Sequence, residues 1–219
     1  MPIPTPLAPP EGFVDRLTEI GVSLDATVIA RLGDYLARLL AMNEQMNLTA
    51  IREPAEAWER HVLDALALVP LLAELGPRAR LVDVGSGGGL PGIPLAIALP
   101  SLRVTLVEAT QKKAAFLVAA AAALELANVS VRAERAEQLV TGELRGAFDA
   151  VTARAVGRLA TLVPLTAPFV RRGGLVLLVK GQRADEELAE ARGVLAKQRS
   201  LHEKTVATPT GRIVVLRRR

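Results

Sequence analysis

The sequence of 219 residues contains no cysteine and only two histidines, His61 and His202. The absence of cysteine excludes disulfide bonds, thiolate metal sites and a cysteine nucleophile. Two histidines are too few for a histidine-rich metal site, so we predict that the protein binds no metal. Aromatic residues make up 3% of the chain, which argues against RNA-binding modules that stack bases on several aromatic side chains.

Long apolar segments are also missing. No run reaches the ~18 residues that a membrane-spanning helix needs, and the proline-rich N-terminus lacks the basic and then apolar pattern of a signal peptide. We therefore expect a soluble, cytoplasmic protein with no membrane partner. The 27 Lys and Arg residues exceed the 23 Asp and Glu residues, and the resulting net charge of +4 favours a polyanionic partner.

The composition divides the chain into three parts. Residues 1–12 are expected to form a flexible arm without packed structure, because half of the first ten residues are proline. Residues 13–76 carry apolar side chains three or four positions apart, which predicts helices, with Asp25 as an N-cap and Pro54 at a helix start. Residues 77–219 are expected to form the main domain.

In this third part, short apolar runs alternate with helical stretches. The runs are LVDV (81–84), VTLVE (104–108), VSVRA (129–133), FDAVTA (148–153) and LVLLVK (175–180). The helical stretches between them are residues 93–99, 112–126 and 159–170. Strands that alternate with helices form parallel βαβ units. Two further runs, 202–207 and 212–218, flank Thr210-Gly211 and predict an antiparallel hairpin, so we expect an α/β fold with a mostly parallel seven-stranded sheet and an antiparallel last strand.

A glycine-rich segment, DVGSGGGLPG, follows the first of these strands. The G-x-G-x-x-G pattern of dinucleotide-binding loops is formally satisfied by Gly87, Gly89 and Gly92. However, Asp83 lies inside the end of the strand, where its carboxylate would repel a pyrophosphate but suit a cofactor with an ammonium or sulfonium group. Glu108 ends the second strand, where a carboxylate can accept the hydroxyl groups of an adenosine ribose. These features resemble the class I S-adenosylmethionine-dependent methyltransferase fold, which is Rossmann-like.

The segment after the fourth strand bears on the methyl acceptor. TARAVG (152–157) lacks the Asn/Asp-Pro-Pro-aromatic sequence of amino-group methylases, and pyrimidine carbon-5 methylases need a cysteine that this chain lacks. With these two classes of methylase excluded, the remaining class of methyl acceptor is an atom that is already nucleophilic. Ring nitrogen 7 of guanine has a free lone pair and no proton to remove, so transfer to it needs positioning but no general base.

Seven segments, in order, resemble one family closely. They are NLTAI (47–51), ERHVLDAL (59–66), LVDVGSGGGLPGIPLAI (81–97), VEATQKKAAFL (107–117), AERAEQL (133–139), VTARAV (151–156) and LVLLVKG (175–181). Over about residues 30–219 the sequence is similar to the bacterial small-subunit ribosomal RNA guanine-N(7)-methyltransferases, the glucose-inhibited division protein B family. The resemblance implies methylation of one guanine in the 530 loop of 16S ribosomal RNA with S-adenosylmethionine. It also implies the small ribosomal subunit as partner; we expect a monomer and no DNA partner.

Site residues follow from the loop, from strand ends and from this resemblance. The residues predicted to bind the cofactor are Asp83, Gly85, Ser86, Gly87, Gly89, Leu90, Glu108, Ala109, Thr110, Ala136, Glu137 and Arg154. The resemblance implies Ala136 and Glu137 as a loop after the third strand that frames the adenine. The residues predicted to act at the acceptor are Asn47, His61, Arg154 and Lys180. The residues predicted to bind RNA are Arg60, Lys112, Lys113, Arg132 and Arg135.

Two departures from the family pattern and three alternative functions stay open. Gly88 stands where many members have proline, which predicts a more flexible loop, and Ala65 stands where they have serine. The first alternative is a nicotinamide dehydrogenase, which the glycine pattern allows. The second is a non-catalytic RNA-binding protein of ribosome assembly. The third is a methyltransferase of the same fold that acts on another RNA base or on a protein, because a fold does not determine its acceptor.

Overall fold

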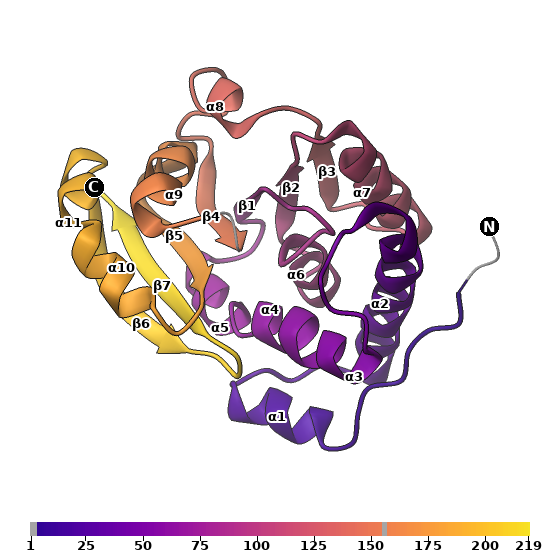
Figure 1. Cartoon of the computed structure of the whole chain (residues 1–219). Coiled ribbons are helices and arrows are strands. Elements are labelled where there is room, and N and C mark those ends of the chain that lie inside the picture. Colours follow the sequence, from indigo (N-terminus) through magenta and orange to yellow (C-terminus); the bar gives the residue numbers. More distant parts are fainter. Residues whose placement is uncertain (1–3, 155–156) are drawn as a thin grey trace.

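The computed structural model describes residues 4–154 and 157–219, in which a seven-stranded sheet lies between two layers of helices (Figure 1). In spatial order the strands are β3 (Val129–Arg132), β2 (Arg103–Val107), β1 (Arg80–Val84), β4 (Phe148–Arg154), β5 (Val170–Lys180), β7 (Arg212–Arg218) and β6 (Ser200–Ala207). Strands β1 to β5 pair in parallel, and β7 pairs antiparallel with both β5 and β6. The predicted α/β fold and the antiparallel last strand are confirmed.

Two apolar cores cover the two faces of the sheet. Neighbouring strand residues such as Leu177 and Leu178 point to opposite faces, as strand geometry requires, and belong to different cores. The first face is covered by α1 (Phe13–Glu19), α2 (Ala26–Met46), α3 (Pro54–Ala57), α4 (Asp64–Leu66), α5 (Val69–Leu72), α6 (Gly92–Ala98) and α7 (Gln111–Ala123). The second face is covered by α8 (Ala136–Leu139), α9 (Leu159–Thr166), α10 (Ala184–Glu190) and α11 (Arg192–Lys197). The helices of residues 13–76 therefore share one core with the sheet.

The predicted helix starts are present, but two predicted helices differ from the structure. Asp25 caps α2 by accepting the Val28 N–H at 2.9 Å, and Pro54 is the first residue of α3. The helical stretch after Pro54 is not continuous, because a π-helical turn, Trp58–Leu63, interrupts it. The predicted helix 159–170 is α-helical only to Thr166. A 3-10 turn, Ala167–Phe169, follows it, where Pro168 has no N–H to continue the α-helix, and Val170 already belongs to β5.

The proline-rich arm is irregular in its described part, yet it is packed at one point. The Leu7 N–H donates to the Gly33 carbonyl oxygen of α2 at 3.1 Å. A Cβ at Gly33 would lie 2.2 Å from the Leu7 carbonyl oxygen, so only glycine allows this approach. The expectation of an unpacked arm is therefore wrong at Leu7. Residues 1–3 of the arm and residues 155–156 of the VTARAV segment lie outside the described residues.

No helix in the described part of the chain is long and apolar enough to cross a membrane.

Candidate functional site

The loop between β1 and α6 brings a glycine backbone and an acid together at the carboxyl edge of the sheet. The Glu108 side chain accepts the Gly87 N–H on Oε2 at 2.9 Å and the Thr110 N–H on Oε1 at 2.7 Å. Gly87 has a φ of +55°, and the nearest described atom to a Cβ at this position would be the Gly85 carbonyl oxygen, 3.9 Å away. The loop therefore presents open space beside a buried carboxylate.

Asp83 lies beneath this loop and is fully buried. Its Oδ2 accepts the Gly92 N–H at 3.2 Å, while its Oδ1 has no hydrogen-bond partner among the described residues. Burial raises the pKa of Asp83 to about 7, although the Gly92 N–H, Ser86 and the nearby Arg154 charge act in the opposite direction. A Cβ at Gly92 would lie 2.9 Å from Asp83 Oδ2 and still closer to a leucine of β2, so glycine is needed for α6 to begin here.

Two predicted cofactor residues point into the protein instead. The Ser86 hydroxyl donates to the Asp83 carbonyl oxygen at 2.9 Å, and Ser86 is 2% exposed. The Leu90 side chain is buried in the first apolar core. Both residues close the turn that carries the glycines, and any contact with a ligand would have to come from their backbone.

The remaining predicted cofactor residues flank the loop. Ala109 and Thr110 are exposed between Glu108 and the start of α7. Ala136 and Glu137 were expected in a loop, and this is wrong: they form the first turn of the short helix α8. Ala136 is half-buried against the second core, while Glu137 is exposed.

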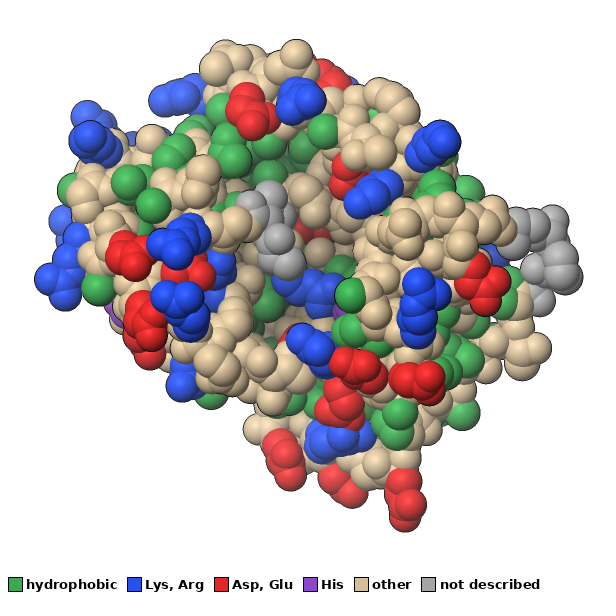
Figure 2. Space-filling model, viewed as in Figure 1, with side chains coloured by type: hydrophobic (Ala, Val, Ile, Leu, Met, Phe, Trp, Pro, Cys, Tyr) green, Lys and Arg blue, Asp and Glu red, His purple; other side chains and the backbone are tan. Residues whose placement is uncertain are grey.

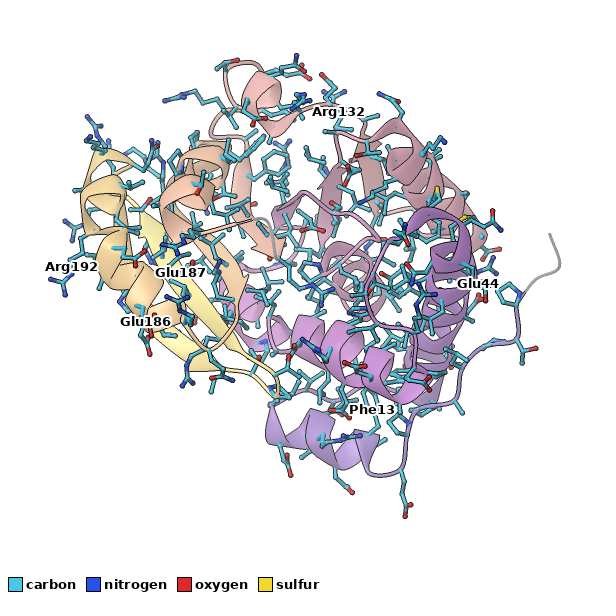
Figure 3. The ribbon with its side chains drawn as sticks, in the orientation of Figure 1. Phe13, Glu44, Arg132, Glu186, Glu187 and Arg192 are labelled. Atoms are coloured by element: carbon cyan, nitrogen blue, oxygen red, sulfur yellow. The ribbon has the colours of Figure 1, made fainter. Side chains whose placement is uncertain are left out.

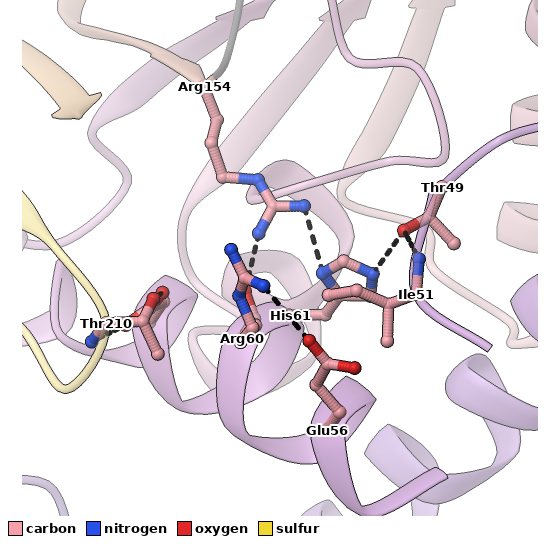
Figure 4. Close-up of polar contacts among 8 residues, drawn as sticks. Thr49, Ile51, Glu56, Arg60, His61, Arg154 and Thr210 are labelled. Atoms are coloured by element: carbon pink, nitrogen blue, oxygen red, sulfur yellow. Dashed lines mark hydrogen bonds and ion pairs between the residues drawn. The ribbon is translucent and has the colours of Figure 1, made fainter. Parts of the chain in front are cut away.

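A cavity of about 360 Å³ lies at the same edge of the sheet, and polar side chains line it. The lining includes Thr49, Arg60, His61, Asp64, Arg154, Lys180 and Thr210. Figure 4 shows Arg154 reaching down from the end of β4 toward the π-helical turn that carries Arg60 and His61. Arg154 Nη1 donates to the Arg60 carbonyl oxygen at 2.6 Å, and Nη2 donates to His61 Nδ1 at 3.0 Å.

These contacts determine the state of His61, which is 3% exposed. Because arginine only donates, Nδ1 must accept and the ring proton lies on Nε2, 2.8 Å from Thr49 Oγ1. Burial, reinforced by the Arg154 charge, lowers the pKa of His61 to about 4. His61 is thus a neutral imidazole with both ring nitrogens engaged, and it positions Arg154.

Arg154 connects the cavity with the glycine loop. Burial lowers the pKa of its guanidinium, while the charges of Asp64 and Asp83 act to raise it. An arginine stays cationic in proteins, so its charge is directed at the carboxylate beneath the loop as well as at the cavity.

The two other predicted acceptor residues differ in placement. Lys180, at the end of β5, is in an ion pair with Glu187 of α10 at 2.9 Å and also donates to the Gly157 carbonyl oxygen. Asn47 is not among the residues that line the cavity. It is exposed and ends α2 in a left-handed conformation with a φ of +48°, which is the common role of asparagine at a helix end.

The predicted RNA-binding residues lie on the surface without forming one continuous basic patch. Arg60 is in an ion pair with Glu56 at 3.0 Å, and Arg132 with Glu143. Lys112 and Arg135 are exposed and Lys113 is half-buried. Figure 2 shows blue and red side chains interspersed over the face that surrounds the central hollow.

Three residues of this site were missed by the sequence analysis. Tyr35 of α2 is fully buried, and its hydroxyl donates to the Gly88 carbonyl oxygen at 2.8 Å. Asp64 accepts the Thr210 N–H at 3.2 Å and also the Thr210 hydroxyl. Asp64 lies in the ERHVLDAL segment (59–66), three residues after His61, and was a detectable signal, whereas nothing near Tyr35 in the sequence indicates its contact.

Comparison with known proteins identifies the family. The family described as rRNA small subunit methyltransferase G has a sequence model that matches residues 28–214. A protein of Sorangium cellulosum called ribosomal RNA small subunit methyltransferase G is 73% identical over 218 residues, which covers 100% of this chain and 91% of that protein. The chain belongs to the rRNA small subunit methyltransferase G family.

Further matches agree with this assignment. A Burkholderia thailandensis protein of the same name is 45% identical over 188 residues, covering 84% of this methyltransferase and 81% of that protein. Among solved structures, geranyl diphosphate C-methyltransferase from Streptomyces coelicolor A3(2) has a TM-score of 0.55 at 16% identity, covering 71% and 78% of the two chains. That likeness shows the fold. The dehydrogenase and the non-catalytic alternatives are wrong, since the family is one of methyltransferases.

The glycine loop fits S-adenosylmethionine, the cofactor of this methyltransferase. Asp83 Oδ1 is a buried acceptor that no described residue contacts by a hydrogen bond, which suits a cationic ligand or a water that contacts one. Each carboxylate oxygen has more than one acceptor position, so Glu108 can bind hydroxyl groups in addition to the two N–H groups that it already accepts. The open side of Gly87 leaves room for the ligand.

Tyr35→Phe is expected to weaken S-adenosylmethionine binding about fivefold. The variant keeps the buried ring but removes the hydrogen bond to Gly88, which costs about 1 kcal/mol. Glycine restricts the backbone less than proline does, so we expect the loop at Gly88 to depend on this contact. Calorimetric titration with the cofactor checks the affinity, and urea unfolding checks the stability; unchanged affinity would show that the loop keeps its shape without Tyr35.

His61→Gln is expected to remove part of the pH dependence of stability. The folded pKa of about 4 lies below the ordinary value of 6.5, so the unfolded state binds the proton first and the wild type loses stability as the pH falls from 7.5 to 4.5, by about 2.5 kcal/mol. The variant cannot lose this contribution. Urea unfolding at both pH values measures the change in the free energy of unfolding. The matched control is His202→Gln, at a half-buried position in β6, which is expected to keep the wild-type loss of stability.

Proposed function

We propose that this protein transfers the methyl group of S-adenosylmethionine to ring nitrogen 7 of a guanine in the 530 loop of 16S ribosomal RNA. One observation carries the proposal: Arg154 lies in the polar cavity and acts electrostatically on Asp83 beneath the glycine loop. A methyl donor held by that loop and a base held in that cavity would therefore be neighbours. Membership of a family of small-subunit rRNA methyltransferases supports RNA as the substrate.

On the cofactor side, this chain supplies fixed acceptors and backbone donors. When bound, S-adenosylmethionine supplies an electrophilic methyl group on a sulfonium. Glu108 would accept ribose hydroxyls, and the backbone of Gly85, Gly87 and Gly89 would allow close approach. Ala109, Thr110, Ala136 and Glu137 would border the adenosine end.

On the acceptor side, the cavity suits a base that needs no deprotonation. Both His61 nitrogens are engaged, so His61 is not a free general base. The Asp64 carboxylate is held in place by the N–H and the hydroxyl of Thr210. Positioning is then the main requirement. Arg154 would hold the guanine, and the Asp64 carboxylate would offset the positive charge that the ring acquires on methylation.

On the surface, arginines and lysines would bind RNA phosphates with an affinity that falls with salt. We assign this role to Arg60, Lys112, Lys113, Arg132 and Arg135. Lys180 would keep its ion pair with Glu187 and position the end of β5. The exposed Asn47, at the end of α2, would contact RNA from the rim. We place the protein in the cytoplasm, acting as a monomer on the small ribosomal subunit.

Methylation mapping tests the proposal. The protein is incubated with tritiated S-adenosylmethionine and small subunits that lack the modification, in parallel with protein-free 16S transcript. Borohydride and aniline cleave at guanines methylated on nitrogen 7, and reverse transcription locates the cleavage. A single labelled guanine in the 530 loop is expected. Label at another base or on a ribosomal protein would refute the proposed acceptor and favour the same fold acting elsewhere.

A further inference from the structure

A second polar cavity lies at the opposite edge of the sheet from the methyltransferase site. Its volume is about 890 Å³, and it is lined by the residues that precede or begin β1, β2 and β3, together with Arg31 of α2. Ligands of open α/β sheets bind at the carboxyl edge, so the fold's usual site does not account for a hollow at the amino edge.

Positive charge is concentrated in this hollow. Four arginines line it, Arg31, Arg78, Arg80 and Arg103, against one acid, Glu125. In the described part of the chain, eight other arginines have a carboxylate within 4 Å, but none of these four does. The charge of Arg80 still acts on Asp149, whose pKa it helps to lower. The charge of the other three arginines is available to an external anion.

Two of the four are held in place and two are free to bind. Arg31 donates to the Leu124 carbonyl oxygen at 2.7 Å, and the Arg80 guanidinium lies 5.1 Å from the centre of the Phe148 ring. Arg78 and Arg103 are exposed, and their guanidinium groups make no hydrogen bond to any described residue. A guanidinium matches phosphate geometry with two parallel hydrogen bonds.

We propose that this hollow, the amino-edge arginine cavity, is a second RNA-binding site that holds backbone phosphates of the substrate RNA away from the target base. The inference rests on the RNA methyltransferase function. A 219-residue domain is roughly 45 Å across, so a folded RNA longer than this is long enough to reach both edges of the sheet. Contacts to phosphates position an RNA without reading its sequence, so the cavity would contribute affinity and orientation, while the carboxyl edge selects the base.

The test compares the salt dependence of RNA binding between two variants that each lose two positive charges. Arg78→Asn with Arg103→Gln removes the free cavity arginines, and asparagine suits the φ of +65° at residue 78. Arg192→Gln with Lys197→Gln is the matched control on α11, where Arg192 points away from the molecule (Figure 3). Filter binding of 16S transcript is measured without cofactor over a range of KCl concentrations.

The cavity variant is expected to lower the slope of log affinity against log salt by about 1.4 to 1.8, because each lost phosphate contact contributes about 0.7 to 0.9. The control is expected to keep the wild-type slope, and both variants the wild-type unfolding midpoint. A wild-type slope in the cavity variant, or an equal change in both variants, would overturn the proposal. Methyl transfer by the wild type is measured separately, so a failure of the proposed acceptor is distinguishable from a failure of this site.

Discussion

Arg154→Lys is expected to reduce kcat/KM for methyl transfer to RNA at least a hundredfold. Lysine keeps the positive charge but is a point cation on a flexible stem, and it lacks the rigid planar fork with which Arg154 donates to the Arg60 carbonyl oxygen and to His61 Nδ1. Loss of one fixed donor at a reacting centre typically costs a factor of about 10² to 10³, and a misplacement of about 1 Å can cost about 10². Single-turnover methylation with saturating subunits measures the loss.

The matched control is Arg158→Lys, four residues further along the chain. Arg158 is exposed and in an ion pair with Glu190 at 3.2 Å, and exposed pairs contribute little. This variant is expected to keep wild-type transfer. If Arg154→Lys retained more than about a third of the activity while folding normally, the proposed role of Arg154 in holding the acceptor would be wrong.

Asp83→Asn is expected to weaken S-adenosylmethionine binding about thirtyfold at pH 8. The variant keeps the shape of the buried side chain and an acceptor for the Gly92 N–H, but it removes the negative charge beneath the loop. Charge-assisted hydrogen bonds are typically worth about 1.5 to 3 kcal/mol, and 1.4 kcal/mol is tenfold in affinity. Calorimetric titration measures the change, and Asp185→Asn, an exposed acid of α10, is the control.

The same variant tests the pH dependence. Asp83 with a pKa of about 7 is mostly protonated at pH 6 and mostly ionised at pH 8, so wild-type affinity for a cationic cofactor rises between these values. Asp83→Asn is expected to lose this part of the rise. The raised pKa also means that ionisation costs stability between pH 4 and 7, so the variant is expected to be no less stable than the wild type at pH 8. A variant with wild-type affinity would show that Asp83 only shapes the loop.

Several features could be predicted because their causes are local. Short apolar runs that alternate with helical stretches predict the strands. A continuous apolar run is typical of a parallel strand that is buried on both faces of its sheet. The acid-then-glycine loop requires a positive φ at Gly87 and a close approach of other atoms at Gly92, and a glycine in the sequence marks each position. Glu108 and Arg154 were predictable for a related reason: each comes at the carboxyl end of a parallel strand, and such ends meet at one edge of the sheet.

Short or irregular elements were not predictable to the same degree. The helices α8, α10 and α11 have four to seven residues, too few for a clear periodic pattern. The π-helical turn at Trp58–Leu63 follows the same apolar spacing as an α-helix. Within this turn Trp58 packs against Phe13 of α1 in the first apolar core, a contact that the segment itself does not show.

The sequence by itself determined the α/β fold, the cofactor loop with its two acids, and the family. Only the tertiary structure decided which polar groups meet. His61 binds Arg154 across 93 residues, Tyr35 binds Gly88 across 53, and Asp64 binds Thr210 across 146. The neutral state of His61 and the charge of the amino-edge arginine cavity likewise depend on which groups the fold buries and brings close together. Burial and proximity belong to the packed chain, and sequence spacing alone does not contain them.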